Sequence, residues 1–311
     1  MNIGMVGLGK MGGNMAARLV EAGHKVFGID PSPDNAQQAE KRGIRVVESR
    51  EEMLEALVLQ KIVWLMIPSQ FVKQEIAAWL DILPAGSILI DGGNSRFEET
   101  IEHGKAAEAK GVKLMDIGVS GGIVGAKAGY SMMIGGDEQA FHDIEPALQA
   151  LAQPDGYGHF GPIGSGHYVK MVHNAIEYGM MEAFAEGFEL MEHSPFPPID
   201  YAKLAGVWQN GAVVESFLNS LAVPIFAENR NLDGREGKVN MLGEAQWATE
   251  LAKLKGVDFR VIQASIDRRA ESMAGNISFA TRFLAALRNQ FGGHAINKTS
   301  ADADKDSLKN V

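Results

Sequence analysis

The first half of the chain alternates short apolar runs with segments of helical periodicity, and this alternation limits the fold more than any other feature. Each apolar run is nearly continuous, as in NIGMVGLG at residues 2–9 and SILIDGG at residues 87–93. Such runs are typical of strands that are buried on both faces of a parallel sheet, with helices between them. The pattern therefore predicts an α/β domain over residues 1–165, with a doubly wound, mostly parallel, Rossmann-like sheet.

The pattern changes after the Gly-rich segment GYGHFGPIGSG at residues 156–166. Strand-like runs stop there, and helical periodicity continues to the C-terminal region. We therefore expect an all-α domain over residues 166–298, followed by a polar tail at 299–311. The length of 311 residues also favours two domains, because one hydrophobic core seldom serves so long a chain.

Composition and charge exclude several classes of function. The formal net charge of −10 argues against nucleic acid or an anionic membrane as the main partner, but it is compatible with a small anionic substrate. The chain has no Cys, which excludes disulfides and thiolate nucleophiles, and its His residues lack metal-ligand spacing. The uncharged run IVWLMIPSQFV is far shorter than the roughly 20 apolar residues that span a bilayer. We expect a cytoplasmic protein without a bound metal.

A G-x-G-x-x-G pattern, formed by Gly7, Gly9 and Gly12, lies between the first predicted strand and the first predicted helix. In this context the first Gly makes a tight turn and the second lets the backbone approach a pyrophosphate. The third Gly permits close packing, and the helix N-terminus faces the anion. The sequence therefore predicts a dinucleotide site, and a Gly-rich structural turn is the alternative.

Asp30, at the end of the second predicted strand, bears on the choice of dinucleotide. A carboxylate there can accept hydrogen bonds from a ribose hydroxyl and would repel a 2′-phosphate. The next residues, Pro31 and Ser32, supply no cation. The sequence therefore favours NAD over NADP, although Lys41 and Arg42 lie near enough in the chain to fold back.

The segment GSGHYVKMVHNAIEYGMMEAFAEGFEL is predicted to form a helix that is apolar around most of its circumference. It also carries five polar residues: Lys170, His173, Asn174, Glu177 and Tyr178. At about 100° per residue, these five fall within one arc of the helix. A solvated face would be rich in Glu, Lys, Gln and Ser, whereas this mixture suits a lined pocket. A structural polar network, facing solvent or the other domain, is the alternative.

Two predicted strands end in Gly-rich segments that carry small polar side chains. LIDGGNS contains Asn94, and GVSGGIVGA contains Ser120, Gly121 and Gly122. Ligands bind at the carboxyl ends of the strands in sheets of this kind. We therefore expect these strand ends, the dinucleotide site and the polar helix to meet at one cleft.

Such a cleft fits the oxidation of a secondary alcohol by hydride transfer to a nicotinamide. The reaction needs a base near the hydroxyl group, and a buried Lys170 is the candidate. If the ketone lies β to a carboxylate, loss of carbon dioxide leaves an enol that an acid must protonate at carbon. Glu177, two helical turns from Lys170, is the candidate acid.

The segments GLGKMGGNMA, DGGNS, GVSGG and GHYVKMVHNAIEYGMMEAFAEG together closely resemble 6-phosphogluconate dehydrogenase, within the β-hydroxyacid dehydrogenase superfamily. The resemblance covers most of the chain, whose length is similar to that of the short form of the family. It implies oxidative decarboxylation of 6-phospho-D-gluconate to ribulose 5-phosphate in the oxidative pentose phosphate pathway, with NAD as cofactor rather than NADP. It also implies a homodimer or homotetramer with shared active sites.

Residue by residue, the resemblance implies that Lys170 is the general base and Glu177 the general acid. It places around the substrate Asn94, Ser120, Gly121, Gly122, His173, Asn174, Tyr178, Arg269, Arg288 and His294. It places around the cofactor Gly7, Leu8, Gly9, Lys10, Met11, Gly12, Asp30, Met66, Ile67, Pro68 and Asn94. Arg269 is implied as a phosphate ligand, and Arg288 and His294 as ligands from a neighbouring subunit.

The sequence departs from the long form of the family at two places. GEAQW has Gln246 where the long form has a Lys that helps to hold the phosphate, so the phosphate is expected to have one cation fewer. DPS replaces the Asn-Arg-Thr that is common in enzymes that use NADP, which again fits NAD.

Two other functions remain open from the sequence. A dehydrogenase of the 3-hydroxyisobutyrate type shares the fingerprint, the strand-end glycines and the helical Lys and Asn. It would not need Glu177, Arg269, Arg288 and His294 together. A non-catalytic dinucleotide-sensing protein is the third alternative, and the presence of both Lys170 and Glu177 argues against it.

Overall fold

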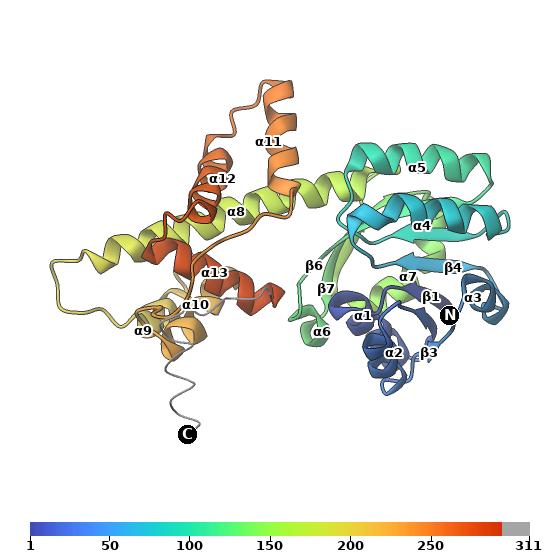
Figure 1. The fold of residues 1–311 in the computed structure, drawn as a ribbon, viewed down its shortest axis with the longest axis horizontal. Helices are drawn as coiled ribbons and strands as arrows, with labels where there is room; N and C mark the ends of the chain where they lie inside the picture. The colour runs from blue at the N-terminus through green and yellow to red at the C-terminus, as the bar shows by residue number, and fades with distance from the viewer. Residues whose placement is uncertain (294–311) are drawn as a thin grey trace. The chain divides into compact units, whose positions relative to one another are not determined.

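A computed structural model describes residues 1–293 of the chain (Figure 1). The chain divides into two compact units, Met1–Met171 and Val172–Val311. The division falls inside helix α8 (Ser165–Glu192), which begins in the first unit and continues in the second. The sequence pattern placed the domain boundary at the beginning of this same helix.

One eight-stranded sheet, with the order β3-β2-β1-β4-β5-β6-β7-β8, forms the centre of the first unit. Its strands are β1 (Asn2–Val6), β2 (Lys25–Ile29), β3 (Arg45–Val46), β4 (Ile62–Leu65), β5 (Ile88–Asp91), β6 (Lys113–Ser120), β7 (Tyr130–Gly136) and β8 (Ala152–His159). Every neighbouring pair is parallel except β6 and β7. The predicted fold class, a doubly wound and mostly parallel sheet, is confirmed.

Helices cover both faces of this sheet (Figure 1). They are α1 (Lys10–Glu21), α2 (Pro33–Glu40), α3 (Arg50–Ala56), α4 (Ser69–Ile82), α5 (Phe97–Ala109), α6 (Gly125–Ala128) and α7 (Glu138–Leu151). Side chains of α1 and α7 pack with Met5 and Trp64 on one face, whereas side chains of α4 and α5 pack with Val6 and Leu65 on the other. Successive residues of a strand point to opposite faces, which is why the strand sequences are apolar throughout.

Two strands, β3 and β8, were not predicted. β3 has only two residues, and β8 has the sequence AQPDGYGH, which overlaps the segment interpreted as a Gly-rich junction. Both are edge strands. An edge strand pairs on one side only and needs no continuous apolar run, so hydrophobic periodicity does not identify it.

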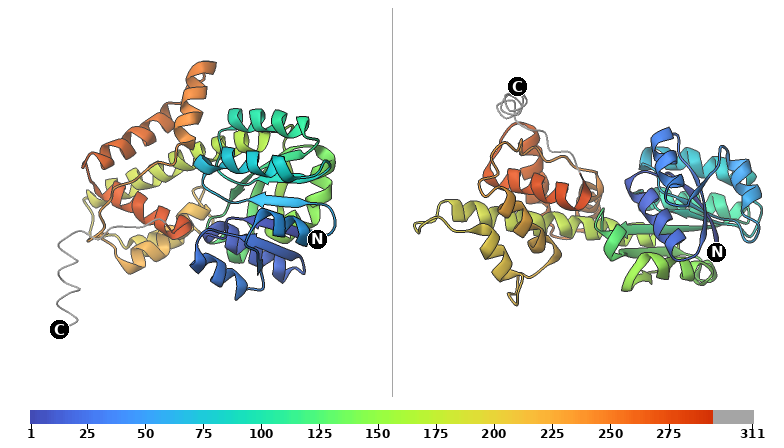
Figure 2. Two further views of the ribbon diagram at one scale, coloured as in Figure 1. Left: turned by 45° about the vertical axis from the view of Figure 1, so that its right-hand side comes forward. Right: turned by 90° about the horizontal axis from the view of Figure 1, so that it is seen from below.

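The described part of the second unit is helical, as expected. After α8 it contains α9 (Tyr201–Trp208), α10 (Phe217–Glu228), α11 (Glu244–Lys255), α12 (Arg260–Met273) and α13 (Phe279–Gly292). Both views of Figure 2 show strands in the first unit only. A core of aromatic residues, including Phe188, Tyr201, Phe226 and Phe283, joins α8, α9, α10 and α13. Over residues 1–293, the structure has no helix with the length and hydropathy needed to cross a membrane.

Candidate functional site

Gly7 and Gly9 lie in the turn between β1 and α1, and Gly12 lies in the first turn of α1. Gly7 has a φ of 91°, and a Cβ atom on Gly12 would lie 2.0 Å from the carbonyl oxygen of Gly7. Gly9 is the N-cap residue of α1, and a Cβ atom there would meet no atom within 4 Å. The first turn of α1 contains no acidic residue. The N–H groups at this helix end are therefore suited to a pyrophosphate, so the residues present fit a dinucleotide.

Asp30 connects the fingerprint turn to the segment after β2. Its Oδ2 accepts a hydrogen bond from the N–H of Leu8 at 2.6 Å. Its Oδ1 accepts hydrogen bonds from the N–H of Ser32 at 2.8 Å and from Nδ2 of Asn35 at 3.1 Å. These contacts hold the carboxylate beside the turn. In this fold, an acid at the corresponding position accepts hydrogen bonds from the ribose hydroxyl groups of a dinucleotide.

Arg42 does fold back toward the fingerprint helix. Its Nη1 donates a hydrogen bond to Oδ1 of Asn14, on α1, at 2.8 Å. Lys41 is exposed. The positive charge of Arg42 is therefore held beside α1. It would attract the 2′-phosphate of NADP, whereas the carboxylate of Asp30 would repel it.

Residues from the ends of other strands lie at or near the fingerprint. A Cβ atom on Gly7 would lie 2.4 Å from the carbonyl oxygen of Met66 and 3.0 Å from a methyl group of Ile67. Pro68 is the N-cap residue of α4. Asn94 is exposed in the loop between β5 and α5. The structure thus brings the end of β4 against the fingerprint, and it places Asn94 beyond the end of the adjacent strand.

Lys170 packs directly against β6. A Cβ atom on Gly118 would come within 2.3 Å of the Cβ atom of Lys170, so glycine at this position lets α8 approach the sheet. Lys170 is only 7% exposed. Ser120 ends the same strand, and Gly121 and Gly122 follow it with φ values of 122° and 52°. The structure therefore packs Lys170, on α8, against the strand that leads into the predicted substrate loop.

Asp116, also on β6, holds the beginning of α8, and the sequence analysis did not identify it. Its side chain is fully buried. Oδ1 accepts a hydrogen bond from the N–H of Gly164 at 2.7 Å, and Oδ2 accepts one from the N–H of His167 at 2.7 Å. Burial raises the pKa of Asp116, and the neighbouring His167 and the two N–H groups partly oppose that shift. The carboxylate caps the helix that carries Lys170.

We expect Asp116→Asn to lower the free energy of unfolding by about 2 kcal/mol, because the amide can accept at only one oxygen and leaves one buried N–H unsatisfied. Urea unfolding followed by circular dichroism measures this change. Asp81→Asn is the matched control, because the Asp81 side chain is 75% exposed. Equal stability of the wild type and the Asp116 variant would contradict the capping role.

In the second unit, Arg269 forms the centre of a buried group of polar side chains. It is fully buried, and its Cζ lies 3.4 Å from the centroid of the Tyr178 ring. Nη2 lies 3.5 Å from Sδ of Met181, whereas Nε and Nη1 have no hydrogen-bond partner among the described residues. Burial lowers the pKa of Arg269 to about 10. A buried guanidinium with unused donors is suited to an anion.

Arg288 lies close enough to interact electrostatically with Arg269. It is 8% exposed, and burial lowers its pKa, while Tyr178, Glu177 and Glu244 act in the opposite direction. The role of Arg288 in the site of a neighbouring subunit stays a prediction; within its own chain, α13 packs against α10. This packing places Arg288 beside Arg269 of the same chain. His294, implied with it, lies outside the described residues.

The other polar residues of the α8 stripe form a short network. Nδ1 of His173 lies 2.9 Å from Oδ1 of Asn174, and Nδ2 of Asn174 donates to Oε1 of Glu244 at 3.2 Å. Nδ1 of His173 also lies 4.0 Å from Oε2 of Glu177. Glu244, which the sequence analysis did not identify, is buried. A polar network of the kind considered as the structural alternative therefore exists around His173 and Asn174.

Gln246, which stands where the long form has Lys, does not bring a positive charge to this group. Its Nε2 lies 3.1 Å from Sδ of Met241, and its buried Oε1 accepts no hydrogen bond from the described residues. The buried cations identified around Tyr178 are therefore Arg269 and Arg288. Within residues 1–293, no group of three or more His, Asp or Glu side chains is arranged to hold a metal ion.

Two family models match the chain. The first, the NAD binding domain of 6-phosphogluconate dehydrogenase, matches residues 2–169, and the second, the C-terminal domain of 6-phosphogluconate dehydrogenase, matches residues 166–284. The chain is 36% identical over 302 residues to the NAD(+)-dependent, decarboxylating 6-phosphogluconate dehydrogenase of Haloferax volcanii, covering 95% of this chain and 98% of that protein. A Bacillus subtilis protein, provisionally named 6-phosphogluconate dehydrogenase, is 37% identical over 298 residues. The match covers 96% of this chain and 100% of that protein.

Solved structures with the same fold include two kinds of dehydrogenase. The 6-phosphogluconate dehydrogenase of Plasmodium falciparum gives a TM-score of 0.81 at 28% identity, covering 88% of this chain and 62% of that chain. The 3-hydroxyisobutyrate dehydrogenase of Mycobacterium tuberculosis gives a TM-score of 0.71 at 26% identity, covering 92% and 99%.

Proposed function

The chain belongs to the 6-phosphogluconate dehydrogenase family, and we propose that it oxidises and decarboxylates 6-phospho-D-gluconate to ribulose 5-phosphate with NAD as electron acceptor. The observation that carries the choice of substrate is the buried pair of Arg269 and Arg288 beside Tyr178. Two desolvated guanidinium groups have a strong requirement for an anion. A terminal phosphate would meet that requirement.

In the proposed reaction, Lys170 accepts the proton of the C3 hydroxyl group while hydride leaves C3. The nicotinamide ring supplies the hydride acceptor when the dinucleotide is bound. The resulting β-keto acid loses carbon dioxide, and Glu177 protonates C1 of the enediol. Lys170 is buried, and the beginning of its side chain lies next to Gly118. Glu177 is half-buried on the next turns of the same helix.

Steady-state assays with 6-phosphogluconate and each dinucleotide test this proposal. We expect turnover with both the oxidation and the release of carbon dioxide, and a kcat/KM for NAD at least about tenfold above that for NADP, because Asp30 repels a 2′-phosphate. Absence of reduced dinucleotide would refute the reaction. A preference for NADP would refute only the choice of cofactor, and the position of Arg42 beside α1 would then explain it.

A dehydrogenase of the 3-hydroxyisobutyrate type is the second candidate. The observation in its favour is the likeness to the Mycobacterium tuberculosis enzyme over almost the whole of both chains. That substrate carries a carboxylate but no terminal phosphate, so the buried Arg269 would have no phosphate to bind. Parallel assays with 3-hydroxyisobutyrate and 6-phosphogluconate separate the two candidates, and faster turnover of the former would favour the second.

A further inference from the structure

Helix α8 carries a second buried acid, Glu182, which the proposed reaction does not use. The residue is 5% exposed, and within residues 1–293 neither carboxylate oxygen has a hydrogen-bond partner. An ionised carboxylate in such surroundings is unfavourable unless a positive charge lies close by. Burial raises the pKa of Glu182 to about 7, with Glu186 and Glu189 adding to the shift and Arg269 and Arg268 opposing it.

The contacts of Arg269 place its guanidinium over the turn of α8 that carries Glu182. The group stacks on the ring of Tyr178 at 3.4 Å and approaches Sδ of Met181 at 3.5 Å. Tyr178 lies one helical turn before Glu182, on the same side of α8. The charge of Arg269 therefore acts on Glu182 without a direct hydrogen bond.

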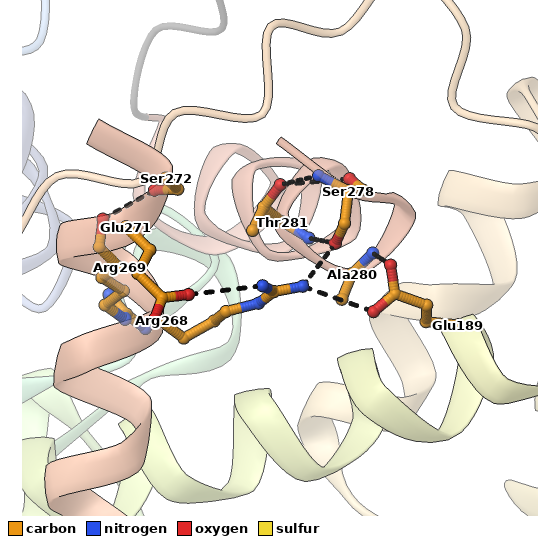
Figure 3. Close-up of polar contacts among 8 residues, drawn as sticks. All are labelled: Glu189, Arg268, Arg269, Glu271, Ser272, Ser278, Ala280 and Thr281. Carbon is orange, nitrogen blue, oxygen red and sulfur yellow. Dashed lines mark hydrogen bonds and ion pairs between the residues drawn. The ribbon is translucent and has the colours of Figure 1, made fainter. Parts of the chain in front are cut away.

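The neighbouring arginine, Arg268, is occupied by other partners (Figure 3). Its Nη2 donates a hydrogen bond to Oγ of Ser278 at 2.7 Å and lies 3.4 Å from Oε2 of Glu189. Its Nη1 lies 3.5 Å from Oε2 of Glu271. Arg268 thus ties α12 to α8 and to the beginning of α13. Glu182 and Arg269 are left as a buried pair of opposite charge with unused hydrogen-bonding atoms.

We propose that Glu182 is a positioning residue for Arg269 and takes up a proton when an anion binds to the Arg269 guanidinium. In the free protein, the carboxylate supplies part of the negative charge that a buried guanidinium requires. A bound anion takes over that role and repels the carboxylate. Protonation of Glu182 removes the repulsion and keeps the charge of the buried group balanced. Only the identity of the anion, a sugar phosphate, rests on the proposed function.

The direction of the pH dependence follows from this exchange. Uptake of a proton on binding means that the affinity for the anion is highest when Glu182 is already protonated, and falls as the pH rises above about 7. The charged groups that face Glu182 are Glu186 and Glu189 on its own helix, and Arg268 and Arg269 on α12. The arginines stay charged throughout this range of pH. Glu182 therefore dominates the expected change.

Inorganic sulfate is the appropriate probe, because it does not titrate near neutral pH, whereas a phosphate group has a pKa near 6. Isothermal titration calorimetry on the full chain gives its affinity at about pH 6 and about pH 8.5. For the wild type we expect about a tenfold loss of affinity at the higher pH, the equivalent of about one pKa unit of coupling. Titrations near pH 7 in two buffers with different ionisation enthalpies should show net proton uptake.

Three variants complete the test. Glu182→Gln should bind sulfate with an affinity that does not change with pH and without proton uptake. Glu186→Gln, which removes an exposed carboxylate one turn farther along α8, should keep the proton uptake, but its affinity should begin to fall at a lower pH, because Glu186 raises the pKa of Glu182. Arg269→Met should lose sulfate binding.

Several outcomes would overturn the proposal. These are wild-type sulfate affinity that is independent of pH, proton uptake that persists in Glu182→Gln, and sulfate binding that survives in Arg269→Met. The proton count on the wild type needs no variant, so a poorly folded variant would leave the test intact. Sulfate binding requires no turnover, so the two proposals can fail separately. If sulfate binding is coupled to proton uptake by Glu182 but the protein does not oxidise 6-phosphogluconate, only the proposed function is refuted.

Discussion

Replacing Lys170 by Met is expected to reduce kcat for the oxidation of 6-phosphogluconate by roughly 10²- to 10⁴-fold, the range that a general base contributes. Met keeps an unbranched aliphatic side chain, so the contact with Gly118 and the packing of α8 on β6 should persist. The dinucleotide site lies on β1, α1 and the end of β2, and its affinity should therefore be unchanged. Stopped-flow measurement of reduced dinucleotide gives the rate, and fluorescence titration gives the affinity.

Lys105→Met is the matched control for this variant. Its side chain is 65% exposed on α5 and forms a surface ion pair with Glu102, a helical neighbour. We expect the rate of this control to equal that of the wild type. A Lys170 variant that retained near-normal turnover would remove Lys170 from the role of general base. A parallel loss of dinucleotide affinity would instead point to a general effect on the fold.

Arg269→Met is expected to reduce kcat/KM for 6-phosphogluconate by about 10²- to 10⁴-fold, mainly through KM. Each charge-assisted hydrogen bond to a phosphate contributes roughly 1.5–3 kcal/mol, and Arg269 has two unused donor atoms. Any turnover of gluconate, which lacks the phosphate, should not fall.

Arg268→Met provides the opposite control for this prediction. Arg268 links Glu189, Ser278 and Glu271, so its loss should lower thermal stability and leave the preference for the phosphorylated substrate intact (Figure 3). Measuring kcat/KM for both substrates in both variants separates the two roles. Equal losses for gluconate and 6-phosphogluconate in Arg269→Met would contradict a phosphate contact.

Most of the first unit could be predicted from the sequence, because its signals are local. Six strands of the sheet are apolar runs that end in glycine or polar residues, and the fingerprint glycines follow one of them directly. The turn at Gly7 and the contact of Gly12 with the carbonyl oxygen of Gly7 involve residues within one short segment, whereas the approach of Met66 to both comes from the end of another strand. Periodicity and spacing are sufficient for features of this kind. β3 and β8 escaped prediction because edge strands have a weaker pattern.

The buried acids could not be predicted, because their surroundings come from distant parts of the chain. Asp116 contacts N–H groups that lie 48 and 51 residues farther along the chain. In the sequence, Glu182 cannot be distinguished from any other acid on an amphipathic helix. Only the packing of α12 brings the charge of Arg269 close enough to act on it. Glu244 lies 70 residues from Asn174, to which it is hydrogen-bonded. No local spacing marks such residues.

The sequence by itself determined the fold class, the dinucleotide fingerprint and the set of polar residues on α8, since each depends on periodicity or on a motif within a few residues. Only the tertiary structure decided that Arg288 lies beside Arg269 of its own chain, and that a buried Glu182 accompanies them. The physical reason is that α8 and α13 share an apolar core and Arg268 of α12 contacts both of these segments, while all these partners lie far apart in the sequence. That packing determines which charged side chains are buried and which of them lie close enough to interact.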